Sequence, residues 1–185
     1  MNIVDKIKGF VEEECRKPTS KYGFEPFEYH FVPVVKYALN LAKELGGDRE
    51  IIALAGWLHD IGSIIDGRGE HHISGARIAD KKLSELDYPQ KKIDLVKKCI
   101  LNHRGSVDNK RLSLEEQIIA EADAMSAFDN LAGIFKAAYV YESQTQGEAK
   151  ISTRKKMKNK FKQLHFEKSK EIIRPKYEAA MLLLK

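Results

Sequence analysis

Cysteine is scarce in this sequence, and so are several features that define large classes of protein. Only Cys15 and Cys99 occur in 185 residues, and no Cys-x-x-Cys pair is present. This argues against a zinc ribbon, and we expect two free thiols in a reducing compartment. No glycine-rich phosphate loop follows a strand-like segment, which argues against a nucleotide-binding α/β fold.

Long apolar runs are also missing. The longest ones fall far short of the ~20 residues that span a bilayer. The first residues, Met1 to Lys6, alternate charged with apolar side chains, unlike a signal peptide. We therefore expect a cytoplasmic protein without a membrane partner.

What the chain does have is enough apolar residues for one core. Hydrophobic residues make up 43% of it and charged residues 32%, as in soluble folded proteins. Apolar residues recur at helical spacing along almost the whole chain, and no segment is a convincing strand. The sequence therefore predicts an all-α fold of about one domain.

Several residues predict where the helices begin, bend and end. Asp48 is placed to N-cap one helix, and Ser113 to Glu116 form a capping-box pattern for another. Pro33 implies a kink or a later helix start. Residues 144–152 are polar and predict a mobile loop, and the two C-terminal helices after it are predicted to break at Pro175.

The most informative stretch is Trp57-Leu58-His59-Asp60-Ile61-Gly62. Buried His and Asp side chains are costly unless they are paired or bind a metal. Adjacent side chains on a regular helix point about 100° apart, so both could reach one ion only at a loosened last turn. Gly62 suits such a helix end, where a left-handed residue lets the chain turn.

Other polar residues interrupt apolar helix faces elsewhere in the chain. Imidazole and carboxylate together suit manganese, iron, nickel, magnesium or zinc, and no thiolate joins them. Any one of these histidines alone would be interpreted as structural, but together they indicate a metal site. The set is His30, His59, Asp60, His71 or His72, His103 and Asp123.

The order His30, His59-Asp60, Asp123 resembles the HD superfamily of metal-dependent phosphohydrolases, and His59-Asp60-Ile61-Gly62 matches its HDIG variant. The resemblance covers roughly Phe24 to Tyr141. It implies an HD-domain helical bundle with a buried metal site. We expect a single domain over residues 1–185, with a core at about 24–141 and a C-terminal helical extension at about 142–185.

The resemblance also implies roles for the polar residues. His30, His59, Asp60 and Asp123 would bind one divalent ion, and Asp60 could bridge to a second. His71 and His103 would complete a second metal site or contact the scissile phosphate, so one or two ions per chain are expected. His72 stays the alternative to His71.

The implied function is hydrolysis of a nucleotide or other small phosphate ester by a metal-activated water. Phosphomonoesterase, pyrophosphohydrolase and phosphodiesterase activities all remain open. The catalytic residues would be His59, Asp60 and His103, with His103 as a general acid if it does not bind metal. Arg77 and Arg104 are the candidates for binding the substrate phosphate.

Two departures from the family pattern motivate a different function. Ser63 stands where many two-metal members have lysine, and Asn102-His103 replaces the double histidine of the cyclic-dinucleotide phosphodiesterases. The alternative is a catalytically weak regulatory protein that binds metal or nucleotide. A homodimer is left open.

The basic run Arg154–Lys162 is interpreted as the solvated face of an amphipathic helix. No aromatic residues interleave with its lysines as in a base-stacking surface. A small phosphorylated substrate is therefore the expected partner, and nucleic acid is not. An RNA-associated module ranks as a distant third hypothesis.

Overall fold

The centre of the molecule is α3 (Arg49–Leu58), in which every residue from Ile51 to Leu58 is buried. Its start is fixed as predicted, because Asp48 Oδ1 accepts hydrogen bonds from the N–H groups of Glu50 and Ile51. The computed structural model describes residues 2–105 and 110–185, and these contain helices but no strand. The all-α prediction is confirmed. The sequence between Gly105 and Ser113 is polar and predicts a loop, and residues 106–109 of it lie outside the described residues.

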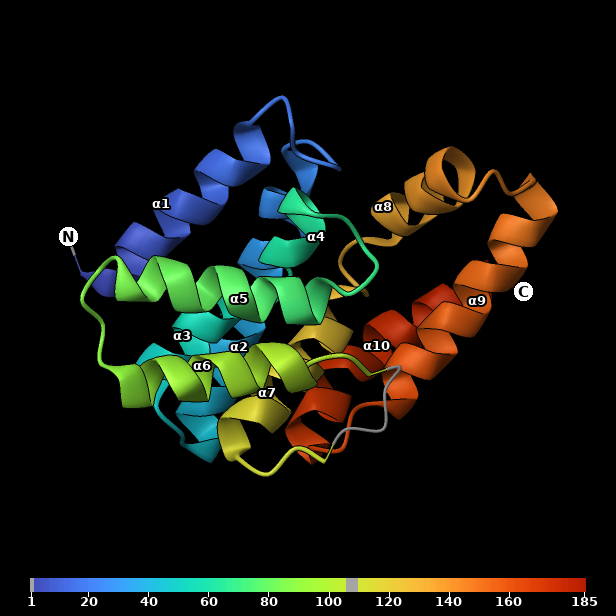
Figure 1. Ribbon diagram of the computed structural model, residues 1–185. Coiled ribbons are helices and arrows are strands. Elements are labelled where there is room, and N and C mark those ends of the chain that lie inside the picture. Colours follow the sequence, from blue (N-terminus) through green and yellow to red (C-terminus); the bar gives the residue numbers. More distant parts are fainter. Residues whose placement is uncertain (1, 106–109) are drawn as a thin grey trace.

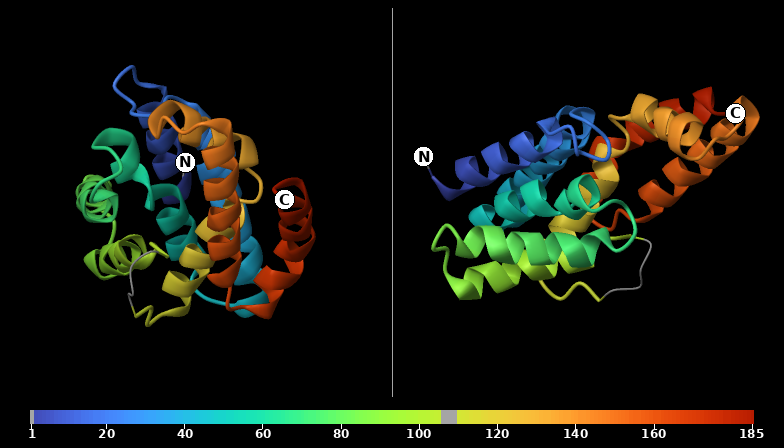
Figure 2. Two further views of the ribbon diagram at one scale, coloured as in Figure 1. Left: turned by 90° about the vertical axis from the view of Figure 1, so that its right-hand side faces the viewer. Right: turned by 45° about the horizontal axis from the view of Figure 1, so that its top comes forward.

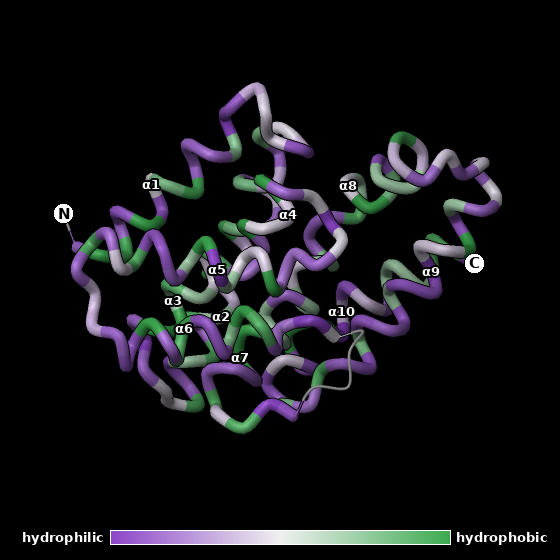
Figure 3. The backbone as a smooth tube through the Cα atoms, in the orientation of Figure 1, coloured by the Kyte–Doolittle hydropathy of each residue, from purple (hydrophilic) through white to green (hydrophobic). Residues whose placement is uncertain are grey.

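The other helices of the bundle surround α3, and Figure 1 shows their arrangement. Contacts are densest between α5 and α6 and between α2 and its neighbours α3 and α7. In Figure 3 the green residues of these helices gather in the interior. The elements are α1 (Ile3–Arg16), the π-helical turn η1 (Phe27–Phe31), α2 (Val32–Leu45), α4 (Ile61–Ile65), α5 (His71–Ser84), α6 (Gln90–Asn102) and α7 (Leu114–Ser126).

The chain then forms an arm that stands away from the bundle, as Figures 1 and 2 show. The arm consists of α8 (Leu131–Lys136), the π-helical turn η2 (Ala137–Tyr141) and α9 (Gln146–Lys162). The last helix, α10 (Glu167–Leu183), begins beside the bundle and runs out along the arm, where Ala180 packs with Met157 of α9. Its start is held by Glu121 of α7, whose Oε1 accepts hydrogen bonds from the N–H groups of His165 and Phe166.

Of the kink or later helix start predicted at Pro33, the structure has the later start, because α2 begins at Val32 after the η1 turn that contains His30. Proline has no N–H to donate to the preceding turn, and the chain forms the wider η1 turn before α2 begins at Val32. The N–H of Val32 accordingly reaches back to the carbonyl of Phe27. Such π-helical turns are often found at functional sites.

The prediction that Gly62 ends a helix in a left-handed conformation was wrong. Gly62 lies within α4 rather than at a left-handed helix end. A Cβ at this position would overlap the carbonyl oxygen of His71 and the Oγ of Ser74, and would lie 2.7 Å from the nitrogen of Gly75. Glycine is required because α4 and α5 approach each other closely here.

The C-terminal part is more helical than predicted. Residues 144–152 are not a loop, because α9 begins at Gln146 with a complete capping box formed by Thr145 and Glu148. The break at Pro175 is absent as well, since Pro175 lies inside α10. It is exposed, and the carbonyl that loses its partner belongs to Glu171, which is exposed to water.

Three further expectations can be compared with the structure. Ser113 caps α7, but Glu116 bonds to Asn102 and not back to Ser113, so only half of the predicted capping box forms. Cys15 and Cys99 are free and buried, as expected. Across residues 2–105 and 110–185, we find no helix with the combined length and apolar character needed to cross a membrane.

Candidate metal centre

Helix ends from across the bundle converge on Asp60. The turn between α3 and α4 consists of His59 and Asp60, and Asp60 has non-helical dihedral angles of −113° and 13°. This is the loosened turn that the sequence predicts. His30 comes from η1, His71 from the first residue of α5, His103 from the residue after α6, and Asp123 from α7.

One oxygen of Asp60 faces His30 and His59. Oδ2 lies 3.2 Å from His30 Nε2 and 3.9 Å from His59 Nε2. The two imidazole Nε2 atoms lie only 2.9 Å apart. These three atoms form a group of potential metal-binding atoms.

The contacts of the two Nδ1 atoms assign the tautomers of these rings. The Nδ1 of His59 lies 2.8 Å from the carbonyl oxygen of Gly56, which only accepts, so Nδ1 holds the proton. The Nδ1 of His30 lies 3.2 Å from Ser126 Oγ, which is also placed to donate to the Asp123 carbonyl oxygen. The His30 tautomer that satisfies both contacts carries its proton at Nδ1 and leaves Nε2 unprotonated. The two Nε2 atoms then face each other beside the Asp60 carboxylate, and a bound cation would satisfy all three groups.

The other oxygen of Asp60 faces His71 and His103. Oδ1 lies 3.2 Å from His71 Nε2 and 3.4 Å from His103 Nε2. The Nδ1 atoms of these histidines donate to the carbonyl oxygens of Arg68 and Ile100. Oδ1 is buried and has no hydrogen-bond partner within the described part of the chain. Asp60 can therefore bridge two groups of nitrogen ligands.

Asp123 completes the side around His30. Its Oδ1 lies 3.8 Å from His30 Nε2, and its Oδ2 forms an ion pair of 2.7 Å with Lys160 of α9. Burial opposes ionisation of this carboxyl, but Lys160 and the nearby histidines hold its pKa below the usual value. Asp123 is therefore ionised, and its Oδ1 is directed towards the same space as His30.

The charges of the buried residues also favour a cation. Burial lowers the pKa of His59 to about 4, so this ring is neutral at pH 7. Burial opposes ionisation of Asp60, but the adjacent histidines keep its pKa well below normal. His103 is also opposed by burial, yet the Asp60 carboxylate raises its pKa. A carboxylate that favours the charged form of a buried neighbour would also favour a bound metal ion.

These observations fit the expected divalent metal. An unpaired buried carboxylate oxygen and unprotonated imidazole nitrogens are ligands for manganese, iron, nickel, magnesium or zinc. HD domains bind divalent metals, and this cluster has the donor set to hold one. Which ion binds, how many bind and which of the six residues are ligands stay predictions.

The structure distinguishes His71 from His72 as the candidate ligand, and Arg104 from Arg77 as the candidate phosphate-binding residue. It places His71 in the cluster and His72 outside it, 3.3 Å from Arg104 through Nδ1. Arg104 does line the cavity around the cluster. Arg77 does not reach it, because its side chain is 75% exposed and pairs with Asp66 on the surface. Its predicted role in substrate binding is therefore not supported by its position.

Sequence analysis missed Ser126, Lys156 and Lys160. The basic run is only partly a solvated face, because Lys160 pairs with Asp123 and Lys156 lines the cavities beside the cluster. The two lysines are four residues apart and therefore share one face of α9. That spacing within the run was the available signal, but nothing in the sequence says what this face packs against.

Two cavities that share several lining residues, among them His30 and Asp60, lie beside the cluster. The inner cavity, of about 420 Å³, is lined by His30, Asp60, His71, His103 and Asp123, together with basic side chains. The outer cavity, of about 710 Å³, extends between the bundle and the arm and is mostly apolar. A molecule in either cavity would contact the candidate metal ligands.

The sequence was compared with known protein families and relatives. The HD domain family model matches residues 27–127. Ribonuclease Y of Enterococcus faecalis is 37% identical over 98 residues, covering 53% of this chain but 17% of that protein. The chain thus corresponds to a small part of that relative's length.

Two solved structures share the whole architecture. An HD-superfamily hydrolase from Bacillus thuringiensis has a TM-score of 0.74 at 18% identity, covering 97% of this chain and 91% of that one. YpgQ of Bacillus subtilis, solved in complex with ADP, has a TM-score of 0.72 at 16% identity, covering 97% and 92%. At these identities the likeness establishes the fold.

Proposed function

The chain belongs to the HD domain family, and on that premise we propose that it is a metal-dependent phosphohydrolase that acts on a nucleotide or other small phosphate ester. The supporting observation is that the Nε2 atoms of His30 and His59 face each other, 2.9 Å apart, beside the Asp60 carboxylate. Because the structurally similar YpgQ was solved in complex with ADP, a nucleotide is the first substrate to test.

Each part of the centre has a role in this proposal. His30, His59, Asp60 and Asp123 hold a divalent ion, which when bound supplies Lewis-acid activation of water and of the phosphate. His103 holds a proton at Nε2 for the leaving oxygen when it is not itself a ligand.

The cations around the centre act on the phosphate. Arg68, Arg104 and Lys156 line the inner cavity and would neutralise the charge on the phosphoryl oxygens. Because these groups are fixed by the fold, they need little rearrangement when charge builds up during the reaction.

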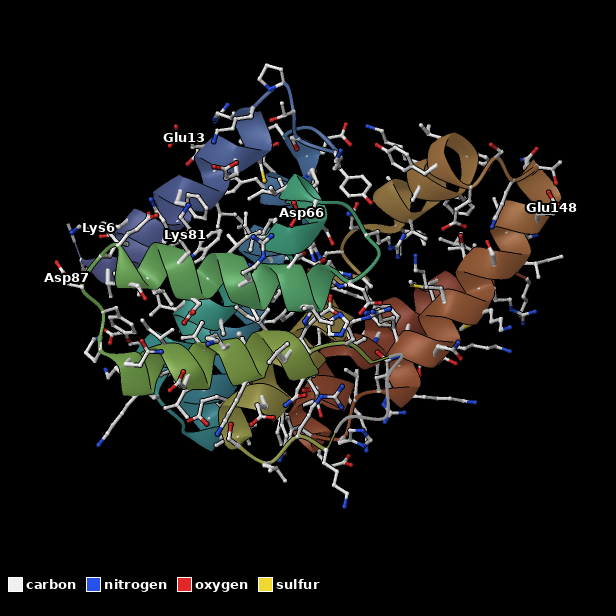
Figure 4. All side chains as sticks on the ribbon, viewed as in Figure 1. Lys6, Glu13, Asp66, Lys81, Asp87 and Glu148 are labelled. Atoms are coloured by element: carbon white, nitrogen blue, oxygen red, sulfur yellow. The ribbon has the colours of Figure 1, made fainter. Side chains whose placement is uncertain are left out.

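The test compares Asp60→Asn with Asp66→Asn. Asp66 is a matched control, because it is a half-exposed carboxylate at the end of α4 that is labelled in Figure 4. We expect the wild type to bind one or two ions per chain and to release phosphate from nucleotides in Mn²⁺. Asp60→Asn should lose the metal and about 10³-fold or more in kcat, whereas Asp66→Asn should retain both.

Metal content is measured by inductively coupled plasma mass spectrometry, and turnover by phosphate release. Full activity in Asp60→Asn would contradict the proposal. Bound metal and tight nucleotide binding without turnover would instead favour the regulatory alternative.

A second candidate is hydrolysis of a phosphodiester in RNA. It is favoured by the 37% identity to ribonuclease Y of Enterococcus faecalis. Cleavage of a single-stranded RNA oligonucleotide that weakens steeply with salt would support it. Hydrolysis of mononucleotides with no cleavage of RNA would exclude it.

A further inference from the structure

The residues that line the outer cavity fall into two chemically different groups. His30 and Asp60 also line the inner cavity, so the outer cavity opens onto the candidate metal centre. The residues that line the outer cavity but not the inner one are here called its aromatic end, and they come from both the bundle and the arm. Their apolar and aromatic members include Tyr22, Tyr29, Phe31, Ile64 and Tyr141.

Cationic side chains mark the boundary between the two ends. Arg68 and Lys156 line both the outer and the inner cavity, whereas the tyrosines line only the outer one. Among residues 2–105 and 110–185, neither cation takes part in an ion pair, although burial and the nearby Arg68 lower the pKa of Lys156. A ligand with an anionic end would therefore place that end at the boundary and its remainder among the aromatic rings.

The aromatic end has rings with free surface. Tyr29 and Tyr141 are 53% and 50% exposed although they line a cavity. Tyr141 reaches across to Tyr22, with ring centroids 5.3 Å apart and planes at 88°. Proteins bind nucleobases by stacking them on such rings. Stacking accepts any base and contributes about 1–3 kcal/mol per base.

Polar groups lie on the same walls. Lys136 of α8 and Glu25, which precedes η1, form an ion pair of 2.7 Å, and both line the outer cavity. They offer one donor and one acceptor at the aromatic end. A flat heterocycle with polar edge groups fits these neighbours better than an aliphatic chain does.

We propose that the outer cavity is a nucleobase subsite, with Tyr22, Tyr29 and Tyr141 as its stacking residues. This proposal rests on the proposed function, and it narrows the substrate from a general phosphate ester to a nucleotide. The phosphates extend past Arg68 and Lys156 to the metal centre, while the base lies between the arm and the bundle.

The experiment pairs protein variants with truncated substrates. Tyr141 is replaced rather than Tyr29, because Tyr29 is adjacent to His30. Tyr141→Ala removes the ring and Tyr141→Phe keeps it. Tyr139→Ala is the matched control, since Tyr139 lies in the same turn and is 44% exposed but does not line the outer cavity. Nucleotides are compared with base-free phosphates, namely AMP with glycerol phosphate and ATP with inorganic triphosphate.

We expect Tyr141→Ala to raise KM for the nucleotide about tenfold or more and to leave KM for the base-free phosphate unchanged. Tyr141→Phe and Tyr139→Ala should resemble the wild type. An equal change for both kinds of substrate would overturn the subsite. So would an equal effect of Tyr139→Ala.

Binding without catalysis gives a separate readout. Adenosine, guanosine, cytidine and uridine are titrated into metal-free protein and followed by saturation-transfer NMR. At least one nucleoside should bind to the wild type and to Tyr139→Ala, and more weakly to Tyr141→Ala. If the wild type hydrolysed no phosphate, the proposed function would fail, and this titration alone would decide the subsite. Loss of binding in Tyr141→Ala would uphold it, and no binding to the wild type would overturn it.

Discussion

At the residue scale, the histidines of the site are oriented by one recurring local contact. His59, His71 and His103 each direct Nδ1 at the carbonyl oxygen three residues earlier in the chain. This leaves Nε2 of each ring facing Asp60. Contacts of this kind fix the tautomer of a metal-binding histidine and raise its basicity. They also restrict the rotation of each ring.

His30 differs, because its Nδ1 partner is the side chain of Ser126 from another helix. Removing this oxygen should let the ring rotate and should weaken the site without unfolding the protein. We expect Ser126→Ala to lower Mn²⁺ affinity by about 10- to 100-fold, measured by isothermal titration calorimetry. Ser84→Ala, at an exposed end of α5, is the control. Unchanged affinity in Ser126→Ala would show that Ser126 does not position His30.

At the scale of single elements, the position of α5 depends on the missing side chain at Gly62. The carbonyl of His71 and the Oγ of Ser74 occupy the space that a Cβ would need. A methyl group here would have to push the start of α5 away from α4. Because His71 is the first residue of α5, the strain would reach the metal centre directly.

We therefore expect Gly62→Ala to destabilise the fold by about 3 kcal/mol or more, as overpacking against backbone does, and to weaken metal binding. Gly9→Ala is a control that should increase the free energy of unfolding. Nothing lies within 4 Å of its Cβ position, and alanine favours a helix interior by about 1 kcal/mol. Urea unfolding followed by circular dichroism measures both changes. A stable Gly62→Ala variant would contradict the packing account.

The sequence predicts this level of structure unevenly. Local signals were sufficient for the cap at Asp48 and the late helix start at Pro33, because the responsible groups lie within one turn of each other. They failed at Gly62, Pro175 and residues 144–152. Whether a glycine allows a left-handed turn or a close approach depends on another helix. Likewise, exposure lets Pro175 remain in α10, and exposure is a property of the whole fold.

The site was predictable to a similar extent. Residue type and order were enough to select His30, His59, Asp60, His103 and Asp123. They did not distinguish His71 from His72, because that choice depends on where α5 begins. The contribution of Lys156 and Lys160 could not be predicted from the sequence, because it depends on α9 packing beside the metal centre.

At the scale of the whole molecule, the first half of α10 and the residues just before it pack into the main core. Leu164 and Ile173 belong to the same apolar cluster as the residues of α2, α3 and α7. Lys176 of α10 also bonds to Tyr37 of α2, and pairs with Asp129 just before the arm. These contacts support the expectation of a single domain, which remains a prediction.

A single domain should unfold in one transition. Trp57 reports on the core, because it is the only tryptophan and is 5% exposed, and circular dichroism reports on all helices. We expect the same urea midpoint from both. Ile173→Ala should lower both midpoints together and cost about 2–5 kcal/mol. An earlier transition seen by circular dichroism alone would mean that α9 and α10 unfold separately.

The proposed metal centre requires a cation between His30, His59 and Asp60. The most direct test is an anomalous difference map from crystals of the protein soaked in Mn²⁺. We predict a peak bounded by the Nε2 atoms of His30 and His59 and by Asp60 Oδ2, and none at that place in Asp60→Asn. A map without a peak there, or with peaks only at exposed residues such as His165, would contradict the central claim.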